Sequence, residues 1–288
     1  MSHILSRKNL EELLALIDQA GAAILEVYNR AGGDFSMELK EDRTPLTEAD
    51  CASNSIITEG LRRLFPEVPL ISEENREIPY EVRRNFEFCW LLDPLDGTRE
   101  FLQRNGEFTI NLALIHRGQP VAGFISVPCQ NLFYYAIRGE GAYKIEASRP
   151  GGCGEKEPRR ENELDLKNIF PLPGVRLRAA EFSMAQPGLA VVASRSHFDE
   201  QTRAFVEKLN QPELTNRGSS LKFVMLAEGV AHLYPRLGRT MEWDTAAGQA
   251  ILEEAGGQVM DFYVRRSLTY NKASLENPPF LATARLQR

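Results

Sequence analysis

The sequence predicts an α/β protein with an N-terminal α+β part and a C-terminal α/β part. Two helical patterns come first along the chain, and short apolar runs separated by glycines and other turn residues follow them. Beyond residue 187, strand-like runs alternate with helix-like runs, which is typical of an α/β layer. We therefore expect one domain over residues 1–184 and a second over residues 185–288.

The first predicted helix begins after Ser6, which can cap it, and ends at Gly32-Gly33. Its apolar residues recur on one face. They are Leu10, Leu13, Leu14, Ile17, Ile24 and Val27. A second helix is predicted from Thr47 to Phe65, and Pro66 ends it.

Antiparallel strands are predicted next, because the apolar runs become short and turn residues separate them. The runs are 88–92, 108–115, 121–127 and 132–137. Residues 147–187 are rich in proline, glycine and charge, which predicts a loop-rich insertion at the domain boundary. After it, strands at 189–193 and 231–234 alternate with helices at 198–209, 218–229 and 244–255.

Composition narrows the class of protein. The chain has 288 residues, 43% of them hydrophobic, and a net charge of −6, which disfavours binding to nucleic acid. No apolar run approaches the ~18 residues that a membrane span needs, and no secretory signal is visible at the N-terminus. Four cysteines without C-x-x-C spacing (Cys51, Cys89, Cys129 and Cys153) predict reduced, structural thiols. We expect a cytoplasmic enzyme without an integral membrane segment.

The most informative stretch runs from Trp90 to Thr98. An apolar strand ends at Asp93, Pro94 cannot donate to a strand ladder, and Asp96 and Gly97 follow. Two carboxylates on one turn would repel each other unless a cation lies between them. Hard oxygen ligands suit Mg²⁺, which proteins commonly share with a phosphate group. The alternative is a surface turn with ordinary Asx hydrogen bonds.

Two further acidic positions favour the metal interpretation. Glu73-Glu74 follow a short apolar run, although they could be a solvated pair at a strand end. Asp244 begins an alanine-rich helix, where an aspartate could equally be the N-cap.

Together these segments resemble the lithium-sensitive, Mg²⁺-dependent phosphatase superfamily. The matching motifs are Glu73-Glu74, then W-x-x-D-P-L-D-G-T, then W-D-T-A-A-G, and the resemblance covers about residues 11–280 apart from the insertion at 147–187. The superfamily includes inositol monophosphatases, fructose-1,6-bisphosphatases and 3′(2′),5′-bisphosphate nucleotidases. It implies a layered αβαβα sandwich with the metal site between its two parts.

The resemblance also implies roles for individual residues. Two or three Mg²⁺ ions would activate water and stabilise the leaving oxygen. Their ligands would be Glu73, Asp93, Asp96 and Asp244, with the carbonyl of Leu95. Asp50 and Thr98, together with Glu73, would be catalytic and orient the attacking water. Asp50 could instead close a capping box opened by Thr47.

Within the superfamily, the match favours the bisphosphate nucleotidases. The residues after Thr98 read R-E-F and then N-G-E-F-T-I-N-L-A-L-I, as in that branch. The expected reaction removes the 3′-phosphate of 3′-phosphoadenosine 5′-phosphate, giving AMP. The expected substrate-binding residues are Gly97, Thr98, His197, Ser219, Lys222, Arg236 and Asp244. Gly97 and Thr98 would offer N–H groups to a phosphate if they open a helix.

Several of these substrate contacts have structural alternatives. Ser219 could cap a helix, Lys222 could lie on a solvated face, and Arg236 could pair with a carboxylate. His197 could cap or pack before Phe198. The alternative functions are an inositol or sugar phosphatase of the same fold and a catalytically silent nucleotide- or metal-binding regulator. We expect a monomer or homodimer in the cytoplasm, with peripheral association to the inner membrane left open.

Overall fold

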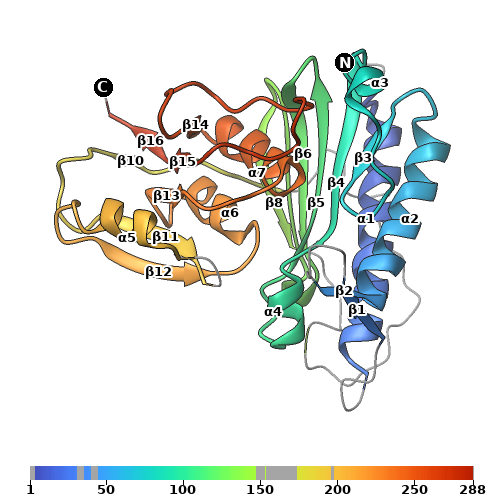
Figure 1. The fold of residues 1–288 in the computed structure, drawn as a ribbon, viewed down its shortest axis with the longest axis horizontal. Coiled ribbons are helices and arrows are strands. Elements are labelled where there is room, and N and C mark those ends of the chain that lie inside the picture. The colour runs from blue at the N-terminus through green and yellow to red at the C-terminus, as the bar shows by residue number, and fades with distance from the viewer. Residues whose placement is uncertain are drawn as a thin grey trace.

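The computed structural model describes residues 4–30, 36–39, 45–146, 153, 174–195 and 198–287. Two large sheets and the helices around them form successive layers in the order αβαβα (Figure 1). The mixed α/β fold expected from the sequence is confirmed.

The N-terminal sheet has seven strands in the order β3-β4-β5-β6-β7-β8-β9. Only β3 and β4 are parallel, and each later pair is antiparallel. The strands are β3 (Leu70–Ser72), β4 (Phe88–Asp96), β5 (Thr109–His116), β6 (Gln119–Val127), β7 (Leu132–Ile137), β8 (Gly141–Glu146) and β9 (Val175–Arg176). The four predicted strands correspond to β4–β7, whereas β8 and β9 were not predicted.

Helices α1 (Arg7–Tyr28) and α2 (Glu48–Leu64) cover one face of this sheet (Figure 1). The Ser6 hydroxyl accepts a hydrogen bond from the N–H of Asn9, so the predicted cap is confirmed. The predicted apolar face of α1, including Leu13 and Ile17, is buried in one core with Trp90 and other residues of the sheet. The predicted end of this helix at Gly32-Gly33 lies outside the described residues. A short β1 (Met37–Leu39) pairs with β2 (Pro45–Thr47) before α2.

Helix α7 (Glu242–Glu254) lies against the other face of the sheet, and helix α6 (Leu221–Ala227) packs against α7 and the second sheet (Figure 1). Gly123 on β6 permits this close approach. A Cβ atom there would lie 2.5 Å from the carbonyl oxygen of Ala247 and 2.8 Å from the Cβ of Ala250 on α7. This central helix layer therefore places the N-terminus of α7 near the end of β4.

The second sheet has the order β12-β11-β13-β15-β14. The strands are β11 (Ala190–Ser194), β12 (Glu213–Arg217), β13 (Leu233–Arg236), β14 (Gln258–Asp261) and β15 (Phe280–Thr283). Helix α5 (Glu200–Val206) packs against β13. It is shorter than the predicted 198–209 at both ends, and it begins after Asp199, which caps it by accepting the N–H of Thr202 at 2.7 Å. The shorter helices α3 (Tyr80–Arg83) and α4 (Thr98–Leu102) flank β4 in the sequence.

The chain passes from the first sheet to the second just after β9. The next strand, β10 (Glu181–Phe182), pairs in parallel with β16 (Arg285–Leu286) at the C-terminal end of the described chain. Of the predicted insertion, residues 147–152 and 154–173 lie outside the described residues. Its remaining part contains β9 and β10. The domain division at residues 184 and 185 stays a prediction.

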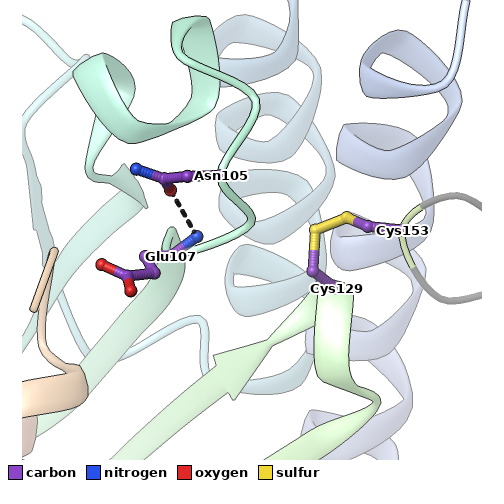
Figure 2. Close-up of a disulfide and its surroundings, with 4 residues drawn as sticks. All are labelled: Asn105, Glu107, Cys129 and Cys153. Carbon is purple, nitrogen blue, oxygen red and sulfur yellow. Dashed lines mark hydrogen bonds between the residues drawn. A yellow bond between two sulfur atoms is a disulfide. The ribbon is translucent and has the colours of Figure 1, made fainter.

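One expectation about the cysteines is wrong. Cys129, in the 3₁₀ helix η2 (Pro128–Gln130), forms a disulfide with Cys153, whereas Cys51 and Cys89 are thiols (Figure 2). Spacing along the chain does not reveal this pair, because the two residues are 24 positions apart. The fold brings their Cα atoms to 4.7 Å, within the range that a disulfide needs.

Within the described residues, no helix combines the length and the apolar character that crossing a bilayer requires. The cytoplasmic location and the monomeric or homodimeric state stay predictions.

Candidate active site

A pocket of about 210 Å³ lies where the end of β4 meets α4, α6 and the N-terminus of α7. Ten residues that the sequence analysis singled out line it. They are Glu73, Asp93, Leu95, Asp96, Gly97, Thr98, Ser219, Lys222, Arg236 and Asp244. The fold therefore brings together five separate segments of the chain.

Asp93 and Asp96 face the same pocket because β4 contains a bulge. Asp93 pairs with Asn111 and Asp96 with Thr109, so three steps on β4 match two on β5. In a regular strand, side chains three positions apart point to opposite faces. The extra residue turns the second carboxylate back toward the first. Oδ1 of Asp93 accepts the N–H of Leu95 at 3.1 Å, which fixes the turn.

Glu73 reaches the pocket because β3 runs parallel to β4. Its N–H donates to the carbonyl of Leu92 at 3.1 Å, so the residue lies beside the end of β4. Asp93 is almost completely buried, and this burial raises its pKa well above the usual range. The charges of Glu73, Asp96 and Asp244 raise it further. The site thus concentrates negative charge that a cation would stabilise.

Asp244 is the third residue of α7, so the suggestion that it is the N-cap is wrong. Its Oδ2 accepts the N–H of Met241, the N-cap, at 2.8 Å. Burial, followed by the charges of Asp96 and Glu73, raises the pKa of Asp244 to about 8. The carboxyl group therefore stabilises the N-terminus of α7 and also lines the pocket.

These side chains do not form a ready-made metal cage. Within the part of the chain that the structure describes, no group of three or more acidic, histidine or cysteine side chains is arranged to hold a metal ion. Instead, Asp93, Asp96 and Asp244 each accept hydrogen bonds from nearby protein donors. Carboxylates without a cation repel one another, so each forms hydrogen bonds with protein donors instead of turning toward a common point. The metal assignment stays a prediction based on donor chemistry.

Asp50 combines the two roles considered for it. It completes a capping box with Thr47 at the start of α2, with its Oδ2 accepting the N–H of Thr47 at 2.8 Å. Its Oδ1 accepts the hydroxyl of Thr98 at 3.5 Å. Asp50 does not line the pocket and contacts it through Thr98. Gly97 is the N-cap of α4, with a φ of 94° that favours glycine.

Lys222 and Arg236 supply positive charge to the same pocket. Lys222 is only 4% exposed, so the suggestion of a solvated face is wrong. Its Nζ donates to the carbonyls of Ser219 and, at 3.2 Å, Arg217. Burial lowers the pKa of Lys222 to about 8, and the nearby charge of Arg236 acts in the same direction. Two cations held close together suit a multiply charged anion.

Two predicted substrate contacts remain, Ser219 and His197. Ser219 does not cap α6, because the N-cap is Ser220. Its hydroxyl lies 3.1 Å from that of Thr109, and its φ is 42°. His197 lies outside the described residues.

The sequence analysis missed the polar residues that support the carboxylates. Asn111 and Ser220 are both buried and both donate to Oδ2 of Asp96. Glu107 accepts the N–H of Gly218 at 2.7 Å and forms ion pairs with two arginines. The signal was present in the motifs N-G-E-F-T-I-N and G-S-S, which contain these residues.

Comparison with known proteins identifies the family to which this fold and pocket belong. The family model described as the inositol monophosphatase family matches residues 7–286. The chain belongs to this family, as the motifs indicated.

Individual relatives within and around this family can be compared with the chain in more detail. The 3′(2′),5′-bisphosphate nucleotidase CysQ of Salmonella typhimurium is 40% identical over 275 residues, covering 95% of this chain and 99% of that protein. The crystal structure of CysQ from Bacteroides thetaiotaomicron is 36% identical with a TM-score of 0.77, and covers 98% of this chain and 99% of that one. An IMPase/NADP phosphatase solved with Mg²⁺ and phosphate shares the fold at 17% identity and a TM-score of 0.69, over 92% of this chain and 86% of that one.

Proposed function

We propose that this protein is a 3′(2′),5′-bisphosphate nucleotidase that hydrolyses the 3′-phosphate of 3′-phosphoadenosine 5′-phosphate, giving AMP and phosphate. The observation that carries the proposal is one pocket lined both by the carboxylates Glu73, Asp93, Asp96 and Asp244 and by the buried cations Lys222 and Arg236. The similarity to bisphosphate nucleotidases over nearly the whole chain supports it.

The acidic side of the pocket fits Mg²⁺ by its donor chemistry. Carboxylate and carbonyl oxygens are the ligands that Mg²⁺ prefers, and Glu73, Asp93, Asp96, Asp244 and the carbonyl of Leu95 would hold it. When bound, Mg²⁺ lowers the pKa of water and neutralises charge on a phosphoryl group. The raised pKa of Asp93 agrees with this, because buried carboxylates of like charge need a cation to ionise together.

Asp50 and Thr98 would position the attacking water. Thr98 lines the pocket and its hydroxyl donates to Asp50, so the hydroxyl oxygen can accept a hydrogen bond from water. Asp50 is itself held in place by the capping box of α2. In this role Asp50 orients Thr98, and Thr98 orients the nucleophile.

Lys222 and Arg236 would bind the phosphate that is not cleaved. Both are buried, so the charge–phosphate interaction would form away from bulk water, where it is stronger. A bisphosphate with one phosphate on the acidic side and the other at these cations would use the whole pocket. A monophosphate would make only one of these two contacts.

The test is product analysis with purified protein and 3′-phosphoadenosine 5′-phosphate in the presence of Mg²⁺. We expect equimolar AMP and phosphate, separated by ion-exchange chromatography, and no reaction in excess EDTA. Formation of adenosine 3′-phosphate would show that the 5′-phosphate is cleaved and would overturn the proposed binding mode.

Lithium should inhibit the enzyme at millimolar concentrations by competing with Mg²⁺ for the shared carboxylates, as the family resemblance implies. The measurement is the initial rate over a LiCl titration at limiting Mg²⁺, with KCl at equal ionic strength as the control. Equal rates in both salts up to tens of millimolar would contradict this expectation.

Mg²⁺ binding should strengthen as the pH rises from 6 to 9. The pKa of Asp244 in the metal-free protein is about 8, so below this pH its carboxyl keeps a proton that competes with the metal. A single competing proton weakens binding by up to ~10-fold per pH unit. The Mg²⁺ concentration at half-maximal thermal stabilisation measures this. A constant value across the range would show that Asp244 does not release a proton on binding.

A further inference from the structure

Two buried polar residues that no motif role accounts for, Asn111 and Ser220, connect the two halves of the acidic site. Ser220 belongs to the turn that opens α6, and Asn111 is the third residue of β5. Both are almost completely buried. Buried polar side chains are costly unless they are hydrogen-bonded, so their partners show what they stabilise.

Ser220 occupies the N-cap position of α6, yet its side chain makes no capping hydrogen bond. Its Oγ lies 3.0 Å from Oδ2 of Asp96 and 3.0 Å from the backbone carbonyl of Asp244. A serine in this position normally caps its own helix. Here the hydroxyl instead lies between a carboxylate at the end of β4 and a backbone carbonyl in the first turn of α7.

Asn111 fixes the direction of this hydroxyl. Its Nδ2 donates to Oγ of Ser220 at 2.8 Å and to Oδ2 of Asp96 at 3.1 Å. Its Oδ1 accepts the hydroxyl of Thr109 at 3.0 Å, which determines which way the amide points. Because the Ser220 oxygen already accepts from Asn111, its single proton is directed to Asp96 or to Asp244.

The geometry assigns Ser220 and Asn111 as positioning residues that hold Asp96 and Asp244 at a fixed separation for Mg²⁺ binding. Asp96 comes from the N-terminal sheet and Asp244 from the central helix layer, so their separation depends on how these elements pack. The Ser220 hydroxyl lies between Oδ2 of Asp96 and the backbone carbonyl of Asp244, and its proton is donated to one of them at a time. It also reserves Oδ2 of Asp96 for protein donors, which orients Oδ1. This inference rests on the proposed metal-dependent function.

Residues that orient metal ligands typically contribute 10- to 100-fold to metal affinity. We therefore expect Ser220→Ala to raise the Mg²⁺ concentration that gives half-maximal thermal stabilisation of the substrate-free protein by about this factor. Ser126→Ala is the matched control. It removes a buried hydroxyl from β6, away from the pocket-lining residues, and should leave this concentration unchanged.

Asn111→Ala tests whether the two residues act together. If both act through Asp96, the double variant should weaken Mg²⁺ binding by little more than either single variant, because contacting residues are not additive. Independent losses that multiply would contradict a shared network.

Other outcomes distinguish the alternatives. A Ser220→Ala protein with normal Mg²⁺ binding but a raised KM would show that the hydroxyl contacts substrate and would overturn the inference. A lower Tm without metal, with an unchanged half-maximal Mg²⁺ concentration, would show a purely structural role and would also overturn it. Failure of the wild-type protein to respond to Mg²⁺ would instead contradict the proposed function.

Discussion

Replacing Asp93 by asparagine should lower kcat by about 1000-fold or more while leaving the fold intact. The carboxylate lies at the centre of the acidic site, where it would help to hold Mg²⁺ against the charge that develops in the transition state. Asparagine has the same shape but no charge, so it removes electrostatic stabilisation with little change in packing. Initial rates at saturating Mg²⁺ and substrate measure the loss.

The stability of the Asp93→Asn protein provides the control. Burial and neighbouring carboxylates raise the pKa of Asp93, so its ionised form costs free energy in the metal-free protein at pH 7. The neutral variant should therefore unfold at the same or a higher temperature than the wild type in EDTA. A lower Tm would mean that the loss of activity reflects a damaged fold, and near-normal turnover would contradict the metal mechanism.

Lys222→Ala should selectively impair hydrolysis of the bisphosphate. A charge-assisted hydrogen bond is worth ~1.5–3 kcal/mol, which corresponds to a loss of roughly 10- to 150-fold in kcat/KM. A monophosphate such as inositol 1-phosphate has no second phosphate for Lys222 to contact, so its low rate of hydrolysis should change little. The measurement is kcat/KM for both substrates in wild type and variant.

An equal loss on both substrates would show that Lys222 supports the fold or the metal site instead. This distinction matters because Lys222 also donates to the carbonyls of Arg217 and Ser219. Lys222→Arg is the useful comparison variant. It keeps a positive charge, so the selective loss should be partly restored if charge is what the substrate requires.

Most of the helices and strands that position the site can be predicted from the sequence, because local signals such as helix caps and turn residues define them. Ser6 and Thr47 cap their helices as expected, and alternation with turn residues identifies β4–β7. Strand pairs between distant segments, such as β10 with β16, have no local signal. For the same reason the disulfide between Cys129 and Cys153 was missed, since only the fold brings the two residues together.

The site residues follow the same division. The motifs single out Asp93, Asp96 and Asp244, but their spacing does not reveal the bulge that turns Asp96 into the pocket. The structure decided between the alternative roles that the sequence pattern left open for Lys222 and Asp244. Lys222 is enclosed rather than solvated, and Asp244 accepts the N–H of its helix N-cap rather than being the cap. Asn111 and Ser220 were overlooked because their importance lies in contacts between segments far apart in the sequence.

The most direct test of the central claim is the ratio of kcat/KM for 3′-phosphoadenosine 5′-phosphate to that for inositol 1-phosphate. Both substrates are measured with the same preparation at saturating Mg²⁺, with EDTA as the blank. The pocket holds two buried cations as well as its carboxylates, so the bisphosphate should be preferred by at least ~10-fold. A ratio of one or less would contradict the nucleotidase assignment and favour an inositol phosphatase of the same family.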